Sequence, residues 1–290
     1  MPQEPAGEQP AHQGGRSAPE DKRSAPKDNP STLDGARPAA EGARAWSGPE
    51  GAQAFAAVDA ATDWLVGYPF VFRALAEPGR TGRVLLDFGC GPGAVAEHAA
   101  RLLGMRIIGV DASPEMLALA RERGTPGAEY HLVTGGRAEG LSDACADAAM
   151  CNHVLASLPD ERTVLAVFSE IHRLLRPGAP LVLLTTDPAC SGIEYASLRV
   201  GVPGVRYGPG RPMTVRLRRT DGTWQTMPNH AWPPAAISAL LERAGFTRVV
   251  QHHPTPDEAE GVADPAHAHS RDWTAERRRP PLVVTVALKG

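Results

Sequence analysis

A glycine-rich turn between an apolar run and an amphipathic stretch constrains the fold of this chain more than any other feature. The run Val84–Phe88 predicts a buried strand, and the turn GCGPG at 89–93 follows it directly. Beyond the turn, apolar residues recur at helical spacing until Gly104 ends the pattern. A strand that passes through glycines into a helix is typical of a β-α-β unit, which builds a parallel sheet.

The alternation of strand and helix patterns continues to the end of the sequence. A helical stretch at 55–75, interrupted near Gly67, precedes it. Ser113 and Asp160 are favourable N-caps for two later helices, and another helix is predicted around 237–244. Further strands are predicted at 107–110, 130–133, 148–151, 181–186, 246–250 and 282–288. Together with the first strand, they predict a doubly wound, Rossmann-like α/β domain with seven strands.

The first part of the chain differs in composition from the rest. Residues 1–50 are rich in Pro, Gly, Ala, Ser, Glu and Arg, and almost no large apolar side chain precedes Trp46. Such a segment buries too little apolar surface to offset its ordering entropy. We therefore expect a disordered tail at 1–50, followed by a single domain at 51–290.

Composition and charge argue against several other classes of protein. The tail lacks the apolar run of a secretory signal, and no later stretch has the roughly 20 apolar residues of a membrane span. The four cysteines lack the paired spacing of a zinc site, and a His-x-His pair within 254–281 is no basis for predicting a metal. A formal net charge of -3 gives no electrostatic reason to expect nucleic acid. We expect a cytoplasmic monomer or homodimer, with no membrane or nucleic-acid partner.

One segment interrupts the regular alternation. Within 188–229, two strand patterns at 214–219 and 223–226 flank Asp221-Gly222, which is a strong signal for a two-residue hairpin turn. An insertion after the fifth strand lies near the carboxyl edge of the sheet, where open α/β folds bind ligands. The hairpin is therefore a lid or substrate wall, or else a surface decoration.

The glycine turn and the acid after the second strand predict a nucleoside-binding crevice. Gly89 and Gly91 allow close backbone approach to a ligand, and the N–H groups of the following helix point to the same place. Asp111 is placed to accept hydrogen bonds from ribose hydroxyls. The same spacing fits the dinucleotide pattern, so an NAD(P)-dependent oxidoreductase is an alternative. Asp87 favours an amino-acid ammonium over a pyrophosphate, and Pro92 removes an N–H that phosphate would use.

Three segments carry a resemblance to a known family. VLLDFGCGPG at 84–93 resembles the first motif of class I S-adenosylmethionine-dependent methyltransferases, and IIGVDASPEMLALA at 107–120 resembles the second. LLRPGAPLVLL at 174–184 resembles the turn before their fifth strand. The similarity extends through ERAGF at 242–246. It implies the strand order 3-2-1-4-5-7-6, with the seventh strand, at 282–288, antiparallel.

The resemblance also implies a set of S-adenosylmethionine-binding residues. They are Tyr68, Asp87, Gly89, Cys90, Gly91, Gly93, Asp111, Ala112, Met116, Ala138, Cys151 and Asn152. Asp87 would attract the methionine ammonium, the glycines would line the methionyl and ribose portion, and Asp111 would hold the ribose. Ala112 and Met116 would flank the adenine, while Cys151 and Asn152 would contact the methionyl end. Tyr68 would cover the cofactor, although Tyr68 and Met116 are equally suited to helix packing.

The sequence departs from the family pattern where the adenine amino group is usually bound. An acidic residue commonly follows the third strand, whereas this chain has TGGRAE at 134–139 with no acid at the expected place. Ala138 remains a candidate for a contact through its backbone. The adenine subsite is therefore the part of the cofactor site that the resemblance specifies least.

Two histidines are candidates for acceptor chemistry. His153 follows the fourth strand, near the expected position of the methyl group, and His230 precedes the last long helix. Either could act as a general base, and either could be structural. The sequence after the fourth strand, CNHV at 151–154, does not match the N-P-P-Y-like motif of nucleic-acid amine methylation. We therefore expect a small-molecule acceptor, in the manner of natural-product tailoring; a non-catalytic cofactor-binding protein is a further alternative.

Overall fold

The computed structural model describes residues 48–76 and 83–290. The chain divides into two compact units, and every described residue lies in the one that spans 37–290. The predicted tail at 1–50 falls almost wholly outside the described residues. Its last three residues are an exception, because helix α2 begins at Gly48.

The helices and strands follow the predicted alternation closely. The helices are α2 (Gly48–Ala56), α3 (Ala61–Val66), α4 (Tyr68–Leu75), α5 (Ala94–Leu103), α6 (Pro114–Glu122), η1 (Val154–Ser157), α7 (Glu161–Leu174), η2 (Pro188–Cys190), α8 (Pro234–Arg243), α9 (Pro265–Ala268) and α10 (Thr274–Arg278). The strands are β1 (Val84–Phe88), β2 (Arg106–Asp111), β3 (Ala128–Thr134), β4 (Arg137–Ala138), β5 (Ala148–Asn152), β6 (Pro180–Thr186), β7 (Leu198–Val200), β8 (Arg211–Arg218), β9 (Trp224–Ala231), β10 (Phe246–His252) and β11 (Leu282–Lys289). Both predicted N-caps are present, with Ser113 accepting from the Met116 N–H and Asp160 from the Thr163 N–H.

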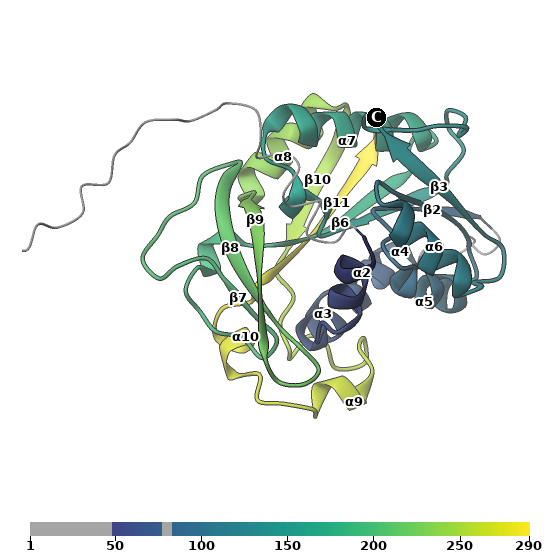
Figure 1. Ribbon diagram of the computed structural model, residues 1–290. Coiled ribbons are helices and arrows are strands. Elements are labelled where there is room, and N and C mark those ends of the chain that lie inside the picture. Colours follow the sequence, from purple (N-terminus) through teal and green to yellow (C-terminus); the bar gives the residue numbers. More distant parts are fainter. Residues whose placement is uncertain (1–47, 77–82) are drawn as a thin grey trace, which may run out of the picture. The chain divides into compact units, whose positions relative to one another are not determined.

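The main sheet has the predicted strand order with one addition. Its eight strands run β10-β11-β6-β5-β1-β2-β3-β4, so the two-residue strand β4 extends the expected seven at one edge. Figure 1 shows β10, β11, β6, β2 and β3 of this sheet. Five neighbouring strands of this sheet, β3, β2, β1, β5 and β6 in that order, pair in parallel. Strand β11 pairs antiparallel with both β6 and β10, as expected for the seventh strand. The carboxyl ends of the parallel strands therefore meet at a common edge, where ligands bind in such sheets.

Helices cover both faces of the main sheet, because its strands alternate their buried side chains between two cores. Leu86 and Phe88 of β1 belong to a core shared with α7 and α8. Leu85, on the opposite face, belongs to a second core shared with α3, α4 and α5. All five side chains of β1 are buried, which explains the unbroken apolar run around Asp87. This leaves Asp87 as a buried carboxyl group at the end of a central strand.

The break between α3 and α4 has a steric cause at Gly67. A Cβ at this position would lie 2.8 Å from the Asp63 carbonyl oxygen and 2.9 Å from the Leu184 side chain. The backbone can approach β6 this closely only without a side chain. The turn sets the start of α4 at Tyr68 and holds α3, which carries Asp63, over the carboxyl edge of the sheet.

The insertion after β6 forms a small antiparallel sheet of its own. Its order is β7-β8-β9, and β8 and β9 form the predicted hairpin around Asp221. Strand β7 was not predicted, and it pairs with β8 around a separate apolar core. Immediately after β9, the Trp232 indole N–H donates to the Leu158 carbonyl oxygen over 3.0 Å. This hydrogen bond connects the end of the insertion to the segment that follows β5.

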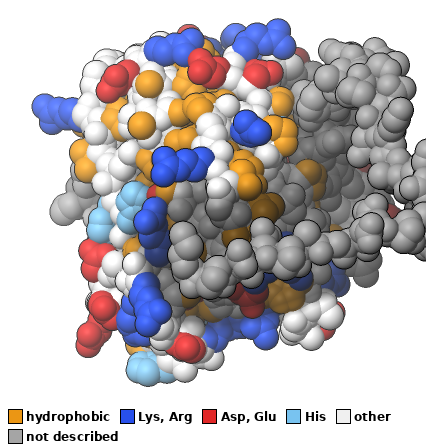
Figure 2. Space-filling view, turned by 90° about the vertical axis from the view of Figure 1, so that its left-hand side faces the viewer, with side chains coloured by type: hydrophobic (Ala, Val, Ile, Leu, Met, Phe, Trp, Pro, Cys, Tyr) orange, Lys and Arg blue, Asp and Glu red, His pale blue; other side chains and the backbone are white. Residues whose placement is uncertain are grey.

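Basic, acidic and apolar side chains are interspersed on the face shown in Figure 2. Within 48–76 and 83–290, no helix is long and apolar enough to cross a membrane.

Candidate functional site

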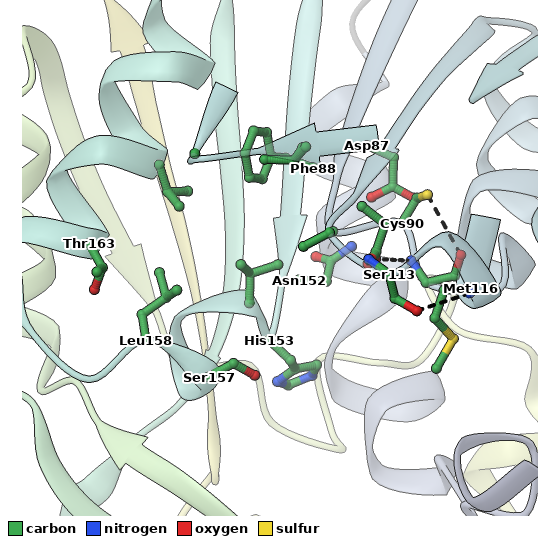
Figure 3. Close-up of a pocket in the computed structure, with 18 of the residues that line it drawn as sticks. Asp87, Phe88, Cys90, Ser113, Met116, Asn152, His153, Ser157, Leu158 and Thr163 are labelled. Carbon is green, nitrogen blue, oxygen red and sulfur yellow. Dashed lines mark hydrogen bonds between the residues drawn. The ribbon is translucent and has the colours of Figure 1, made fainter. Parts of the chain in front are cut away.

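A cavity of about 720 Å³ opens at the carboxyl ends of β1, β2 and β5. This volume lies within the range of roughly 300–1,000 Å³ that small-molecule sites occupy. Figure 3 shows Asp87, Cys90 and Met116 at one end and Leu158 and Thr163 at the other, with Asn152 and His153 between them. The helices α2, α4, α5, α6, η1 and α7 and the strands β1, β2, β3 and β5 all contribute residues to the lining of the cavity.

The glycine turn shapes one wall of the cavity. Gly89 has a φ of +79°, and a Cβ on it would lie 2.2 Å from Cγ2 of Val154. Gly91 also has a positive φ, of +52°, but a Cβ there would meet nothing within 4 Å. The chain thus passes Val154 at a distance only glycine permits, which leaves a backbone-lined cradle beside the cavity.

Asp111 joins the turn to the end of β2. Its Oδ2 accepts a hydrogen bond from the Gly91 N–H over 2.8 Å, and its Oδ1 accepts from the Ser113 N–H over 2.9 Å. Burial raises the pKa of Asp111, while these two N–H donors act in the opposite direction. Each carboxylate oxygen retains acceptor capacity toward the cavity, because an ionised carboxylate offers about four acceptor sites. This arrangement suits a pair of vicinal hydroxyl groups.

Asp87 is the most perturbed acid in the cavity. Its side chain is buried, with 2% of its surface exposed, and burial raises its pKa to about 8. The negative charge of Asp111 adds to the shift. In the described part of the chain, no lysine or arginine forms an ion pair with Asp87. A buried acid without a cation is stabilised by a positively charged ligand.

The loop after β5 contributes polar groups to the middle of the cavity. Both amide atoms of Asn152 are shielded from solvent and have no hydrogen-bond partner in the described structure. The ring of His153 lies beside it, and its Nε2 is 2.7 Å from Oδ1 of Asp63 on α3. Unsatisfied buried amide groups are costly, so the Asn152 side chain is well placed for a polar ligand.

The structure brings together ten of the fourteen residues predicted for the site. Those lining the cavity are Tyr68, Asp87, Gly89, Cys90, Gly91, Asp111, Ala112, Met116, Asn152 and His153. They come from α4, the β1 turn, the β2 end with α6, and the β5 end. The predicted roles of these residues are taken up below as proposals.

Four predicted residues lie outside the cavity lining. Gly93 is the N-cap of α5 and packs against Ala120, where an added Cβ would come within 3.1 Å. Cys151 is 1% exposed and belongs to the core on the α7 face. His230 lies on β9, where it is 8% exposed, and it is not among the residues that line the cavity. Ala138 is considered next, because its position bears on the adenine subsite.

Ala138 has its backbone N–H already engaged. It lies on β4, is 1% exposed, and donates to Oε1 of Glu170 over 2.9 Å. Arg173 in turn pairs with the same carboxylate, at 2.7 Å from its Nη2. Gly135 and Gly136 line the cavity instead, together with Val133, so the part of β3 and its turn that reaches the cavity presents no acidic side chain. This agrees with the sequence, in which the acidic residue that commonly follows the third strand is missing.

Other residues line the cavity but were not predicted for the site. They are Phe55, Phe88, Val95, Ser113, Val133, Gly135, Gly136, Val154, Ser157, Leu158, Arg162, Thr163, Ala166 and Val167. Phe55 comes from α2, and the last four from α7, whose amphipathic pattern looks like that of any surface helix. Val154 was within reach, since it follows His153 and the predicted β5.

The fold and the site together define a class I S-adenosylmethionine-dependent methyltransferase. The glycine turn after β1, the acid at the end of β2 and the seven-strand order with its antiparallel member all belong to that class. Comparison with known families agrees, because residues 86–183 match the family described as "Methyltransferase domain". In these residues lie β1 to β6, except for the first two residues of β1 and the last three of β6.

Comparison with individual proteins gives a more specific relationship. The chain is 36% identical over 225 residues to an N-demethylindolmycin N-methyltransferase of Streptomyces griseus, covering 76% of this chain and 94% of that protein. Among solved structures, the fold resembles a methyltransferase from Mesorhizobium loti, with a TM-score of 0.51 and 21% identity over 78% of this chain and 97% of that one. It also resembles CcbJ of Streptomyces caelestis, with a TM-score of 0.53 and 18% identity over 79% and 96%. The chain therefore belongs to the S-adenosylmethionine-dependent methyltransferases and methylates small molecules.

The cavity fits the cofactor of this family. Asp87 lacks a cation, and the cofactor carries an ammonium group. The cradle beside Gly89 accommodates a ligand against backbone, and Asp111 has free acceptor capacity for ribose hydroxyls. Neither the oxidoreductase nor the non-catalytic alternative is favoured by the comparisons. In the described residues, no group of three or more His, Cys, Asp or Glu could hold a metal ion.

Proposed function

We propose that this methyltransferase transfers a methyl group to a nitrogen atom of a small, largely apolar natural product. The observation that carries the proposal is the 36% identity, over most of both chains, to an enzyme named as the N-methyltransferase of N-demethylindolmycin. The cavity supports it, since Phe55, Phe88, Val154 and Leu158 present apolar surface to the acceptor. Arg162, the cationic side chain among the described lining residues, is exposed.

The residues of the glycine turn and β2 would hold the cofactor. Asp87 would pair with the ammonium group, and the backbone of Gly89 and Gly91 would lie along the methionyl and ribose portion. Asp111 would bind the ribose hydroxyls with the acceptor capacity left by its two N–H donors. When bound, S-adenosylmethionine supplies an electrophilic methyl group on a sulfonium centre.

Further lining residues would complete the cofactor site. Ala112 and Met116 would flank the adenine, with Gly135 beside it in place of the family's acid. The unpartnered amide of Asn152 would bind the amino-acid end, and Tyr68 would close the site from α4. Cys90 would contribute its backbone in the turn. The roles predicted for Gly93, Ala138, Cys151 and His230 receive no support from their positions.

His153 would take the proton that the acceptor nitrogen loses. A methylated secondary or primary amine must shed a proton, and a positioned base contributes typically 10²–10⁴-fold to such a step. His153 lines the cavity between its two ends (Figure 3). In-line methyl transfer also depends on alignment, which the enclosing apolar walls would supply. The cytoplasmic location and the monomeric or dimeric state expected from the sequence stay predictions.

The test is a direct assay of the atom that is methylated. Purified protein is incubated with S-adenosylmethionine and matched acceptors: N-demethylindolmycin, its analogue with oxygen in place of the reactive nitrogen, and a tertiary amine. Products are identified by mass and fragmentation. We expect methylation of the amine and none of the oxygen analogue. Transfer to the oxygen analogue alone would refute N-methylation, and thermal stabilisation by S-adenosylhomocysteine would show that the protein used is folded and binds cofactor.

A further inference from the structure

The partner of His153 comes from an element that no sequence pattern connects with the site. Asp63 lies on α3, ninety positions before His153, and its Oδ1 is 2.7 Å from Nε2 of the imidazole. The side chains are 16% and 33% exposed, so the contact is shielded on the Asp63 side and open on the ring side. A contact of this length between a carboxylate and an imidazole is a strong, charge-assisted hydrogen bond.

This contact determines which ring nitrogen can accept a proton. A carboxylate can only accept, so Nε2 of a neutral His153 must carry the hydrogen. The lone pair then resides on Nδ1, to which no described residue makes a hydrogen bond. His153 lines the cavity. Its basic nitrogen is therefore part of a side chain that faces the space for the acceptor. The pair thus has the arrangement of a base oriented by a carboxylate.

The backbone of His153 is held in an unusual conformation. Its φ is +58°, in the left-handed region that costs a residue with a Cβ on the order of 1–2 kcal/mol. The conformation is maintained by the His153 N–H, which donates to the Leu184 carbonyl oxygen over 2.8 Å. It turns the chain directly at the end of β5, where the ring meets α3. Local strain that the surrounding structure maintains is typical of functional positions.

A buried polar network fixes the helix that carries Asp63. The Ser197 hydroxyl accepts from the Thr62 N–H over 3.1 Å and donates to the Thr62 hydroxyl over 2.8 Å. The Thr62 hydroxyl and the Ala196 N–H both donate to Oε1 of Glu276, over 3.3 and 2.9 Å. Thr62, Ser197 and Glu276 are at most 1% exposed. The residue next to Asp63 is therefore anchored to both the insertion and α10.

We propose that Asp63 is a positioning residue that holds His153 as the Nε2–H tautomer, so that Nδ1 receives the proton of the methylated nitrogen. This proposal rests on the proposed N-methylation. The acceptor nitrogen forms its bond to the methyl carbon, and the bond from that carbon to sulfur breaks with its electron pair left on sulfur. The proton from nitrogen passes to Nδ1, and the resulting imidazolium is stabilised by the Asp63 carboxylate. Charge and atoms balance without any further reactant.

The first test measures the tautomer, and it needs no acceptor. Protein labelled with ¹⁵N-histidine is examined by two-bond ¹H–¹⁵N NMR, and the His153 signals are assigned with the His153→Gln variant. We expect the Nε2–H pattern in the unmodified protein and a shift toward Nδ1–H in Asp63→Asn, whose amide can donate to Nε2. Asp59→Asn is the matched control, since Asp59 lies two residues before the same helix, accepts a hydrogen bond from the Ala61 N–H and pairs with Arg271 rather than with His153. An Nδ1–H pattern in the unmodified protein would overturn the proposal.

The second test is kinetic and uses the acceptor identified in the assay above. We expect Asp63→Asn to lower kcat by about 10²–10⁴-fold, with S-adenosylhomocysteine affinity within twofold of the unmodified protein. Asp63→Glu should recover part of the rate, and adding His153→Gln to Asp63→Asn should cost little more than His153→Gln alone. Independent, multiplicative losses would contradict a shared role. If no amine is methylated at all, the N-methylation proposal fails, while the tautomer measurement still decides the Asp63–His153 relationship.

Discussion

Replacing Asp87 with asparagine should stabilise the free protein and weaken cofactor binding at the same time. Asp87 is 2% exposed at the end of β1, and burial raises its pKa from 3.8 to about 8, with Asp111 contributing in the same direction. Asparagine has nearly the same shape and is neutral at every pH. The substitution therefore removes the cost of a buried charge together with the charge that would attract an ammonium group.

The magnitude follows from the linkage between protons and folding. Because the folded pKa lies above the unfolded one, the native state holds a proton that the unfolded chain has lost between about pH 4 and pH 8. The corresponding stability is present in full below about pH 4 and is lost as the pH rises through about 8. The slope inside this window is about 1.4 kcal/mol per pH unit. From pH 6 to pH 8, Asp87 should therefore remove on the order of 2 kcal/mol of stability that Asp87→Asn retains.

Urea unfolding of both proteins at pH 6, 7 and 8 measures this difference. Other titrating groups are common to both, so they cancel when the two pH profiles are subtracted. Calorimetry with S-adenosylhomocysteine supplies the second arm: binding to the unmodified protein near pH 7 should release a proton, seen as a buffer-dependent heat, and Asp87→Asn should bind more weakly without that release. Parallel stability profiles for the two proteins would refute the reasoning, because they would mean that Asp87 is already ionised in the free protein.

Two further predictions concern the glycine turn and the ribose acid. Gly89→Ala should destabilise the protein by about 2–4 kcal/mol in urea unfolding, since it adds a clash with Val154 to the cost of a positive φ, whereas Gly91→Ala should cost only about 1–2 kcal/mol. An equal loss of stability in the two variants would contradict the close approach of Val154 to the turn. Adding Val154→Ala should partly restore the stability of Gly89→Ala but not that of Gly91→Ala. Asp111→Ala should weaken S-adenosylhomocysteine binding by roughly 10–100-fold, the value of one hydrogen bond to a charged group, as measured by calorimetry on folded protein. Unchanged affinity would remove Asp111 from the cofactor site.

The sequence specified the main sheet well because the relevant signals are local. An apolar run such as Val84–Phe88, bounded by glycines, identifies a buried strand without knowledge of its neighbours. Ser113 and Asp160 predicted the starts of two helices, because an N-cap side chain bonds to an N–H group only two or three residues further along the chain. The strand order came from the family resemblance, and the pairing confirms it.

Features that depend on distant partners could not be predicted in this way. Strand β4 is two residues long and exists because it pairs with the end of β3, and β7 exists because it pairs with β8. Leu102 fits the apolar stripe of α5, yet it is 60% exposed. The small residues Ala96 and Ala99 make the buried contact of this helix instead.

The candidate site divides along the same line. Asp87, Gly89 and Asp111, which line the cavity, could be predicted because they belong to the local motifs of one β-α-β unit. Asp63 could not be identified, since nothing in the helix ATDWLV at 61–66 distinguishes its acid from a solvated one. Its importance emerges only when the fold places it 2.7 Å from His153. His230, the other histidine predicted as a candidate base, lies on β9 and is not among the residues that line the cavity, so its role stays a prediction.

The network behind Asp63 has a consequence for how such an enzyme can change its substrate. The match to the family described as "Methyltransferase domain" spans residues 86–183, and Thr62, Ser197 and Glu276 all lie outside those residues. These three residues come from separate stretches of the chain but form one hydrogen-bond network. Exchanging any single stretch for that of another enzyme would leave a buried polar group without its partner. Exchanging segments to transfer acceptor specificity between relatives should therefore succeed only when α3, the insertion and α10 are exchanged together, with the rest of the domain left unchanged.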